Sequence, residues 1–153
     1  MTLTKELFDD FVDRLVYHNK GEGVEYHYTS HPIFIVQKRD RIYGMDSEYS
    51  DEYVWFRTDG DCGYEEADER TTKRLDALYE DGRDIKNWER IYYIDRWEYV
   101  NAHFTKEGAL DFIKRKQHDY DELRVYVDSQ YPCHEFNSII SAIIEGKLIF
   151  KGD

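Results

Sequence analysis

Two histidine–threonine triplets are the residues of this chain whose types and spacing best suit catalysis. His27-Tyr28-Thr29 and His103-Phe104-Thr105 share the pattern His-x-Thr. An imidazole titrates near neutral pH, so one histidine of such a pair can act as a general base while the other acts as a general acid. If the fold brings the two triplets together, their imidazoles are therefore suited to general acid–base catalysis.

Paired His-x-Thr or His-x-Ser triplets resemble the active-site signature of the 2H phosphoesterases. The resemblance implies hydrolysis of a cyclic nucleotide by His27, Thr29, His103 and Thr105. A second interpretation needs no catalysis, because Thr105 precedes a predicted helix and its hydroxyl can accept a hydrogen bond from the first turn. With six histidines in 153 residues, two such triplets also arise readily by chance. Both interpretations stay open at this level.

Metal binding is not expected. The stretch Asp59-Gly60-Asp61 resembles the start of a calcium-binding EF-hand loop, but the register fails. The glycine required at the sixth loop position falls on Tyr64, and the acid required at the twelfth falls on Arg70. Cys133-His134 lacks the paired spacing of a zinc site. We therefore expect neither a metal ion nor a cofactor.

Carboxylates and tyrosines are interleaved over residues 46–69. Tyrosine supplies a large contact area at low entropic cost and is enriched where protein interfaces bind most strongly. The structural alternative is the edge of the core, with the ring buried and the hydroxyl in water. We expect an acidic, tyrosine-rich partner-binding surface made of Asp46, Glu48, Tyr49, Asp51, Glu52, Tyr53, Asp59, Asp61, Tyr64, Glu65, Glu66, Asp68 and Glu69.

Net charge narrows the class of partner. The chain has 33 acidic and 21 basic residues, giving −12 at pH 7. A field of this sign repels nucleic acid backbone, so direct binding to DNA or RNA is disfavoured. It attracts basic protein surfaces, including those that normally hold nucleic acid. An aromatic content of 16% indicates a folded protein rather than a disordered one.

The expected location is the cytoplasm. The apolar runs are too short to span a bilayer, and the first residues lack the basic and apolar regions of a secretory signal. Two cysteines, Cys62 and Cys133, are too few for a disulfide framework. We therefore expect no membrane contact.

The elements that position these residues begin with a helix over 4–19, followed by an antiparallel meander. Apolar residues recur at helical spacing from Phe8 to Val16, and Thr4 is a plausible N-cap. A second helix is predicted from about residue 69 to Tyr79. Residues 38–41 are predicted as a turn within the meander. The meander itself is predicted from strand-like stretches at 24–28, 33–36, 41–43 and 53–57.

A β-α-β-α unit is predicted from residue 91 to Gly146, with a short final strand at 148–150. Its first strand is interrupted by Asp95-Arg96, so the pattern allows one long strand or two short ones. Pro132 suits the first turn of the last helix. The predicted fold is a single α+β domain over residues 1–153, in which an N-terminal helix and the meander are joined by this unit into one mixed sheet.

The C-terminal part resembles a group of small bacteriophage and prophage proteins. The resemblance rests on Tyr92-Tyr-Ile-Asp-Arg-Trp-Glu-Tyr, His103-Phe-Thr-Lys-Glu-Gly-Ala, Arg124-Val-Tyr-Val-Asp-Ser and His134-Glu-Phe. It implies a phage origin and the host cytoplasm, and it carries over no catalytic residue.

These observations favour a non-enzymatic hypothesis. The chain would be a phage accessory protein that binds a host or defence protein with a basic surface, in its strongest form by mimicking nucleic acid. One alternative is the 2H-type phosphoesterase. Another is a homo-oligomeric sponge or scaffold.

Overall fold

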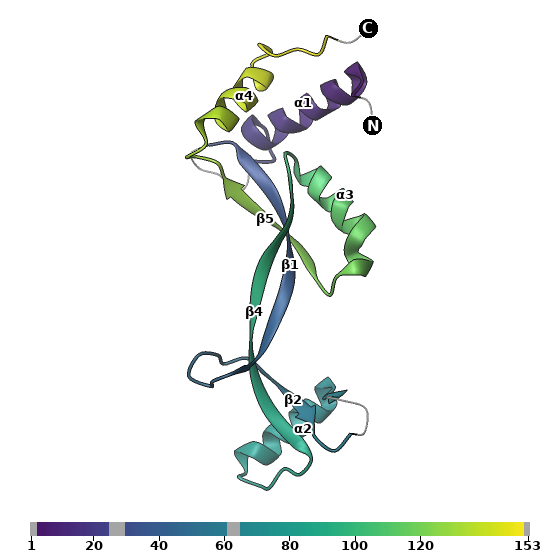
Figure 1. Ribbon diagram of the computed structural model, residues 1–153, viewed down its shortest axis with the longest axis vertical. Helices are drawn as coiled ribbons and strands as arrows, with labels where there is room; N and C mark the ends of the chain where they lie inside the picture. The colour runs from purple at the N-terminus through teal and green to yellow at the C-terminus, as the bar shows by residue number, and fades with distance from the viewer. Residues whose placement is uncertain (1–2, 25–29, 61–64, 152–153) are drawn as a thin grey trace. The chain divides into compact units, whose positions relative to one another are not determined.

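The structure is a computed structural model that describes residues 3–24, 30–60 and 65–151 (Figure 1). It has an α+β fold with an N-terminal helix, as the sequence predicts. In chain order the elements are α1 (Lys5–Lys20), β1 (Pro32–Met45), β2 (Tyr53–Arg57), β3 (Glu65–Glu66), α2 (Glu69–Glu80), β4 (Trp88–His103), α3 (Lys106–Lys116), the short 3₁₀ helix η1 (Gln117–Asp119), β5 (Leu123–Ser129) and α4 (His134–Ile144).

Local start and stop signals place the first three helices as predicted. The Thr4 side chain accepts from Leu7 N at the start of α1, and Gly21 caps the end of that helix. Asp68 caps α2 in the same way through Thr71 N, and Thr105 caps α3 through Gly108 N. Side chains that accept the free N–H groups of a first turn stabilise a helix start by about 1 kcal/mol. Sequence signals within a few residues of each end therefore sufficed.

The C-terminal region differs from the prediction in two respects. Helix α4 begins at His134, so Pro132 precedes the helix instead of lying in its first turn. Residues 148–150 form no strand. The ring of Phe150 instead packs against Phe8 of α1, with ring centroids 6.0 Å apart. The predicted strand is therefore wrong: Phe150 packs against a helix, while Leu148 and Ile149 are exposed.

Strand β1 is continuous where the sequence predicts a turn. Residues 38–41 lie inside β1, in spite of their charges. Their charges are matched by acidic and basic side chains on neighbouring strands: Lys38 with Glu98 at 3.1 Å, Arg39 with Glu122 at 2.8 Å, Asp40 with Arg96 at 3.3 Å, and Arg41 with Asp95 at 2.7 Å. The predicted turn is wrong because these partners are distant in sequence. Strand β4 likewise runs unbroken through Asp95-Arg96.

The five strands form one sheet in the order β3-β2-β4-β1-β5. The pairs β1–β5, β2–β3 and β2–β4 are antiparallel. The β1–β4 ion pairs Lys38–Glu98 and Asp40–Arg96 advance in opposite directions along the two strands, which is also an antiparallel register. The order corrects the expected meander, since β4 lies between β1 and β2. All neighbours are antiparallel, so the sheet is not mixed.

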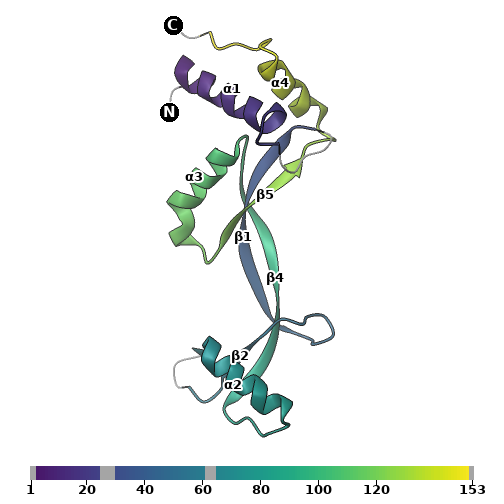
Figure 2. The same cartoon turned by 180° about the vertical axis from the view of Figure 1, so that it is seen from behind.

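The chain groups into two compact units, and β1 and β4 contribute to both. Unit 1 comprises residues 1–39 and 97–153, and unit 2 comprises residues 40–96. Figure 2 shows the same elements from behind. A single domain was predicted, and the number of independently folding domains stays a prediction.

The core of unit 1 lies between helix α3 and one face of β1 and β5. Phe34, Val36, Ala109 and Leu123 are buried together there. His18 of α1 is also buried, and its Nε2 lies 2.9 Å from Glu107 Oε2 of α3. Burying a polar ring is costly unless it is hydrogen-bonded, so this pair ties α1 to α3.

Unit 2 has a smaller core between α2 and β2. Val54, Trp55 and Leu75 are buried there. The Trp55 ring packs edge-on against Tyr79, with centroids 5.9 Å apart. Aromatic pairs of this geometry add to the hydrophobic gain of burial.

The burial of α1 generates a stability prediction. Leu15 is 1% exposed and Leu7 of the same helix is 39% exposed. We expect Leu15→Ala to lower the free energy of unfolding by about 2–5 kcal/mol, because it removes buried methyl groups and leaves a cavity. Leu7→Ala is the matched control and should change it by less than about 0.5 kcal/mol. Urea unfolding followed by circular dichroism measures both, and equal effects would contradict the packing of α1.

Candidate functional site

The described residues of the expected partner-binding surface all lie in unit 2. Asp61 and Tyr64 are outside the described residues. The others divide into two groups according to the elements that carry them. The first group belongs to the loop between β1 and β2 and to the start of β2. The second group lies around β3 and the N-terminus of α2.

The 46–52 loop is held in a defined conformation at its base. The Asp46 carbonyl accepts from Tyr49 N at 2.9 Å, and the Asp46 carboxylate accepts from Glu48 N at 3.0 Å. Ser50 Oγ donates to the Tyr93 carbonyl at 2.5 Å, and Tyr93 N donates to the Glu52 carbonyl at 3.0 Å. An Asx turn with anchored ends restricts the loop before any partner arrives. Such preorganisation lowers the entropic cost of binding.

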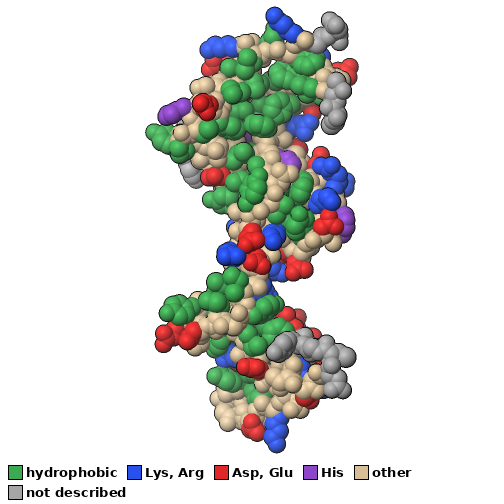
Figure 3. Space-filling model, viewed as in Figure 1, with side chains coloured by type: hydrophobic (Ala, Val, Ile, Leu, Met, Phe, Trp, Pro, Cys, Tyr) green, Lys and Arg blue, Asp and Glu red, His purple; other side chains and the backbone are tan. Residues whose placement is uncertain are grey.

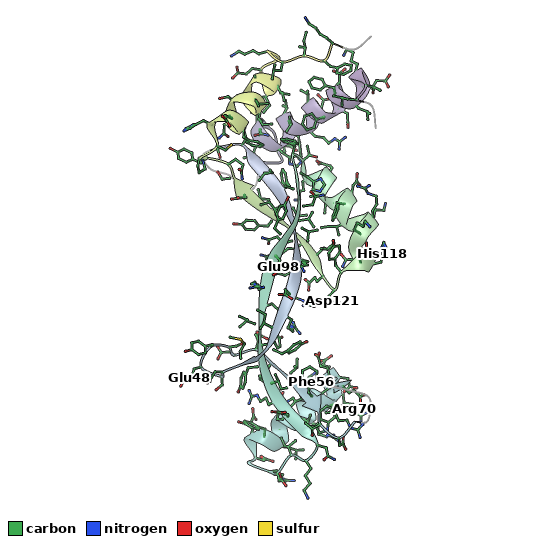
Figure 4. The ribbon with its side chains drawn as sticks, viewed as in Figure 1. Glu48, Phe56, Arg70, Glu98, His118 and Asp121 are labelled. Carbon is green, nitrogen blue, oxygen red and sulfur yellow. The ribbon has the colours of Figure 1, made fainter. Side chains whose placement is uncertain are left out.

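Tyr49 projects from this loop and is 74% exposed. Figure 3 shows acidic side chains beside large hydrophobic-class side chains, which include tyrosine, on the loop. Figure 4 labels Glu48, whose side chain points away from the strands. Tyr49 is more exposed than Tyr43 (44%) and Tyr79 (53%), which are the other exposed tyrosines among the described residues of unit 2. Its ring is therefore available for contact with another molecule.

The loop carboxylates carry uncompensated charge. Asp46, Glu48, Asp51 and Glu52 form no ion pair with any residue that the structure describes. Apart from the local bond of Glu48 N to Asp46, the Tyr93 hydroxyl donates a long hydrogen bond of 3.4 Å to the Glu52 carboxylate. Four carboxylates on one short loop repel each other and attract cations over a distance of about 8–10 Å at physiological salt.

The second acidic group is partly neutralised. Arg57 Nε lies 2.6 Å from Asp59, and its Nη1 lies 3.7 Å from Glu65. Lys73 pairs with Glu69 one helical turn away at 2.6 Å, and Asp68 is occupied as the N-cap of α2. Only Glu66 of this group has no such partner among the described residues. The second group therefore presents less free charge than its composition suggests.

Tyr53 has a positioning role below the loop. Its hydroxyl donates to Asp76 at 2.9 Å, and the same carboxylate oxygen accepts from Trp55 Nε1 at 2.8 Å. The Arg90 guanidinium lies over the Tyr53 ring, 3.6 Å from its centroid. Burial and then the hydrogen bond to Asp76 raise the pKa of Tyr53. The residue joins the loop to the core of unit 2.

A second aromatic layer supports the other end of the loop. Arg41 lies over the Tyr93 ring at 3.7 Å and pairs with Asp95, and the hydrogen bond to Asp95 raises the pKa of Arg41. Tyr43 packs edge-on against both Phe56 and Tyr93, with centroids 5.4 and 6.0 Å apart. Sequence reasoning missed this support. The alternation of aromatic and charged residues in β4 is the signal that would have indicated it.

Of the two His-x-Thr triplets, only the second lies among the described residues. His27 and Thr29 lie outside the described residues, so their approach to His103 stays a prediction. Thr105 is buried, and its hydroxyl accepts from Gly108 N at 3.2 Å, which is the capping role. The His103 ring packs on Phe112 with centroids 5.7 Å apart. Its Nε2 is buried and makes no hydrogen bond within the described part of the chain.

No group of three or more histidine, cysteine, aspartate or glutamate side chains in the described ranges could hold a metal ion. No helix among those residues is long and apolar enough to cross a bilayer. The chain matches no protein-family model, and no curated protein or solved structure shows significant similarity to it.

The buried hydrogen bonds of Asp76 give a prediction for the support of the loop. Asp76→Ala leaves the buried Trp55 N–H and the Tyr53 hydroxyl without their acceptor. We expect it to lower the free energy of unfolding by about 1–3 kcal/mol. Asp76→Asn keeps an acceptor oxygen and should cost less. Tryptophan fluorescence during urea unfolding measures both, and an Asp76→Ala chain as stable as the wild type would show that these bonds contribute nothing.

The environment of His103 gives a pH prediction. Burial, and then the charge of Arg115, lower the pKa of His103 below its ordinary value of 6.5. The unfolded chain therefore binds this proton at a higher pH than the folded chain, so stability present above pH 6.5 is lost as the pH falls through the folded pKa. We expect His103→Gln to flatten the decline of stability below that pH. Denaturant unfolding at a series of pH values measures this, and an unchanged slope would refute it.

Proposed function

We propose that this chain is a phage accessory protein that binds a basic surface of a host or defence protein through the 46–52 loop. The observation that carries the proposal is the combination of a highly exposed Tyr49 with four carboxylates that have no ion pair among the described residues. The phage origin and host cytoplasm are supported by the resemblance of the C-terminal stretch alone.

The charge distribution supports a protein partner. Residues 40–96 contain 17 acidic and nine basic side chains, a net charge of −8, out of −12 for the whole chain. Phosphate backbone would be repelled by this unit, whereas lysine- and arginine-rich protein surfaces would be drawn to it. Charges of this kind raise the rate of association and select among partners more than they add affinity.

Tyr49 supplies the affinity to which the charges add little. Affinity at protein interfaces is concentrated in a few side chains, among which tyrosine is enriched, and these lie inside a rim of polar residues. Tyr49 surrounded by Asp46, Glu48, Asp51 and Glu52 has this composition. The base of the loop is hydrogen-bonded to β4, so the ring is presented with little loss of conformational entropy on binding.

Ordinary protein binding is favoured over mimicry of nucleic acid. Mimicry requires many unpaired carboxylates at regular spacing. Several carboxylates of the second acidic group instead form ion pairs with Arg57 or Lys73. Mimicry of nucleic acid is the more specific hypothesis, and it predicts two further results. A mimic should be displaced from its target by DNA, and its binding should weaken steeply as salt is added.

The experiment is capture of partners from infected host lysate on the immobilised chain, followed by affinity measurement with the purified partner. The variant Asp46→Asn, Glu48→Gln, Asp51→Asn, Glu52→Gln removes four charges and keeps the hydrogen-bond acceptors. We expect it to weaken binding by at least about tenfold, which corresponds to about 1.4 kcal/mol. Tyr49→Ala should weaken binding by a similar factor.

The matched control neutralises the paired acids instead. Asp59→Asn, Glu65→Gln, Glu69→Gln removes three charges from the same unit but leaves the loop intact, and it should retain most of the affinity. Equal loss in the two variants would indicate an effect of total charge. A partner that binds the loop variants as tightly as the wild type would refute the proposal.

A further inference from the structure

Strand β5 is an edge of the sheet in unit 1. Among the described residues, the strand order gives β5 one neighbouring strand, β1. Its seven residues, Leu123–Ser129, contain no proline, and its register with β1 is regular from end to end, without a bulge. Proteins usually protect such edges with proline, bulges or short length, because an unprotected edge pairs with other strands. The edge of β5 is therefore suited to pairing.

The hydrogen-bond pattern shows which residues face outward. Arg39 N donates to the Glu122 carbonyl and Gln130 N donates to the His31 carbonyl, one at each end of the β1–β5 ladder. Hydrogen-bonded pairs recur at every second residue in an antiparallel ladder. The even-numbered residues of β5 therefore bond β1. The odd-numbered residues, Val125 and Val127 among them, direct their backbone N–H and C=O groups to the open edge.

The side chains on the face of β5 turned away from the core are self-complementary. In order they are Arg124, Tyr126 and Asp128, at alternate positions of the strand. Tyr126 is 46% exposed at the centre. Arg124 donates to Gln37 at 2.9 Å and lies over the Trp97 ring, and Asp128 accepts only a long hydrogen bond from Gln130. Neither charge forms an ion pair with another described residue.

We propose that β5 pairs with β5 of a second copy of this chain, antiparallel and centred on Tyr126. In this register each Arg124 lies opposite the partner's Asp128, and the two Tyr126 rings meet on the two-fold axis. Val125 lies opposite the partner's Val127, and these are the residues whose backbone groups face the edge. The positions of the outward-facing backbone groups and the opposition of the side-chain charges therefore favour the same register.

A second copy fits this edge because a strand turned end to end places its acidic residue opposite the basic residue of the first strand, and its basic residue opposite the acidic one. A two-fold interface requires a surface to be complementary to itself. The sequence Arg-Val-Tyr-Val-Asp meets that requirement, since opposite charges lie at equal distances from a central aromatic residue. Tyr126 and Arg124 would occupy non-hydrogen-bonded positions, where cross-strand side chains are closest. The proposal goes beyond the binding of a host protein, which uses residues of unit 2.

The test is the solution mass of the full chain and of charge variants, by light scattering at the highest soluble concentration. The wild type should have about twice the chain mass of 18.5 kDa. Arg124→Asp and Asp128→Arg each place like charges opposite one another and should shift the mass to that of a single chain. The double variant Arg124→Asp, Asp128→Arg restores the opposition of charges and should recover the dimer.

Matched controls and a register test make the outcome decisive. Lys114→Asp and Asp121→Arg change the same charges on exposed positions outside β5 and should leave the dimer intact. With Cys62 and Cys133 replaced by serine, Tyr126→Cys should form a disulfide-linked dimer on oxidation, because its Cα atoms would be about 4.5 Å apart. Arg124→Cys should not cross-link alone, but should do so when mixed with Asp128→Cys.

Several results would overturn the proposal. The first is a wild type that stays at the single-chain mass. The second is a dimer that the single charge reversals do not affect, and the third is a folded double variant that remains a single chain. Capture of a different protein by this edge, abolished by both single reversals and by the double variant, would assign the strand to a foreign partner instead.

Discussion

Opposite charges on facing strands make the long β1 and β4 possible. Within unit 1 Lys38 meets Glu98, and within unit 2 Asp40 meets Arg96 and Arg41 meets Asp95. Exposed pairs of this kind add little stability individually. Their effect is on register, because a shift of one residue would turn each side chain to the other face and break every pair. Two strands can therefore continue through a stretch that has no apolar core of its own.

The presence or absence of an ion pair also divides the acidic residues of unit 2 into two groups. Carboxylates that lie near Arg57 or Lys73 form ion pairs, and those of the 46–52 loop form none with a residue that the structure describes. The loop is nevertheless ordered by backbone and serine hydrogen bonds to Tyr93. Free charge on a structured loop is costly to the isolated protein through self-repulsion. That cost is recovered when a basic surface approaches.

The binding loop and the β5 edge draw on different residues, so the two proposals are compatible. A dimer through β5 would offer two copies of the loop to a partner. Two linked weak contacts bind far more tightly than one if the partner's geometry allows both to be engaged. Modest affinity per loop would then suffice for the proposed function.

The sequence by itself determined the elements whose signals are local. Helices α1, α2 and α3 begin directly after Thr4, Asp68 and Thr105, because each of these N-cap side chains accepts from a backbone N–H only three residues away. The predicted β-α-β-α unit likewise includes the strand β5, and composition predicted the acidic character of residues 46–69. The pairing of Glu69 with Lys73 was also within reach, since it spans one helical turn.

Only the tertiary structure decided what depends on residues distant in the chain. It placed residues 38–41 inside a strand, because their partners Glu98, Arg96 and Asp95 arrive from β4. It inserted β4 between β1 and β2. Within the described part of the chain, it also left one edge of β5 without a neighbouring strand and showed which carboxylates have no ion pair. Hydrogen bonds in a sheet join residues without regard to their separation in sequence, so no local pattern of residues records which strands become neighbours.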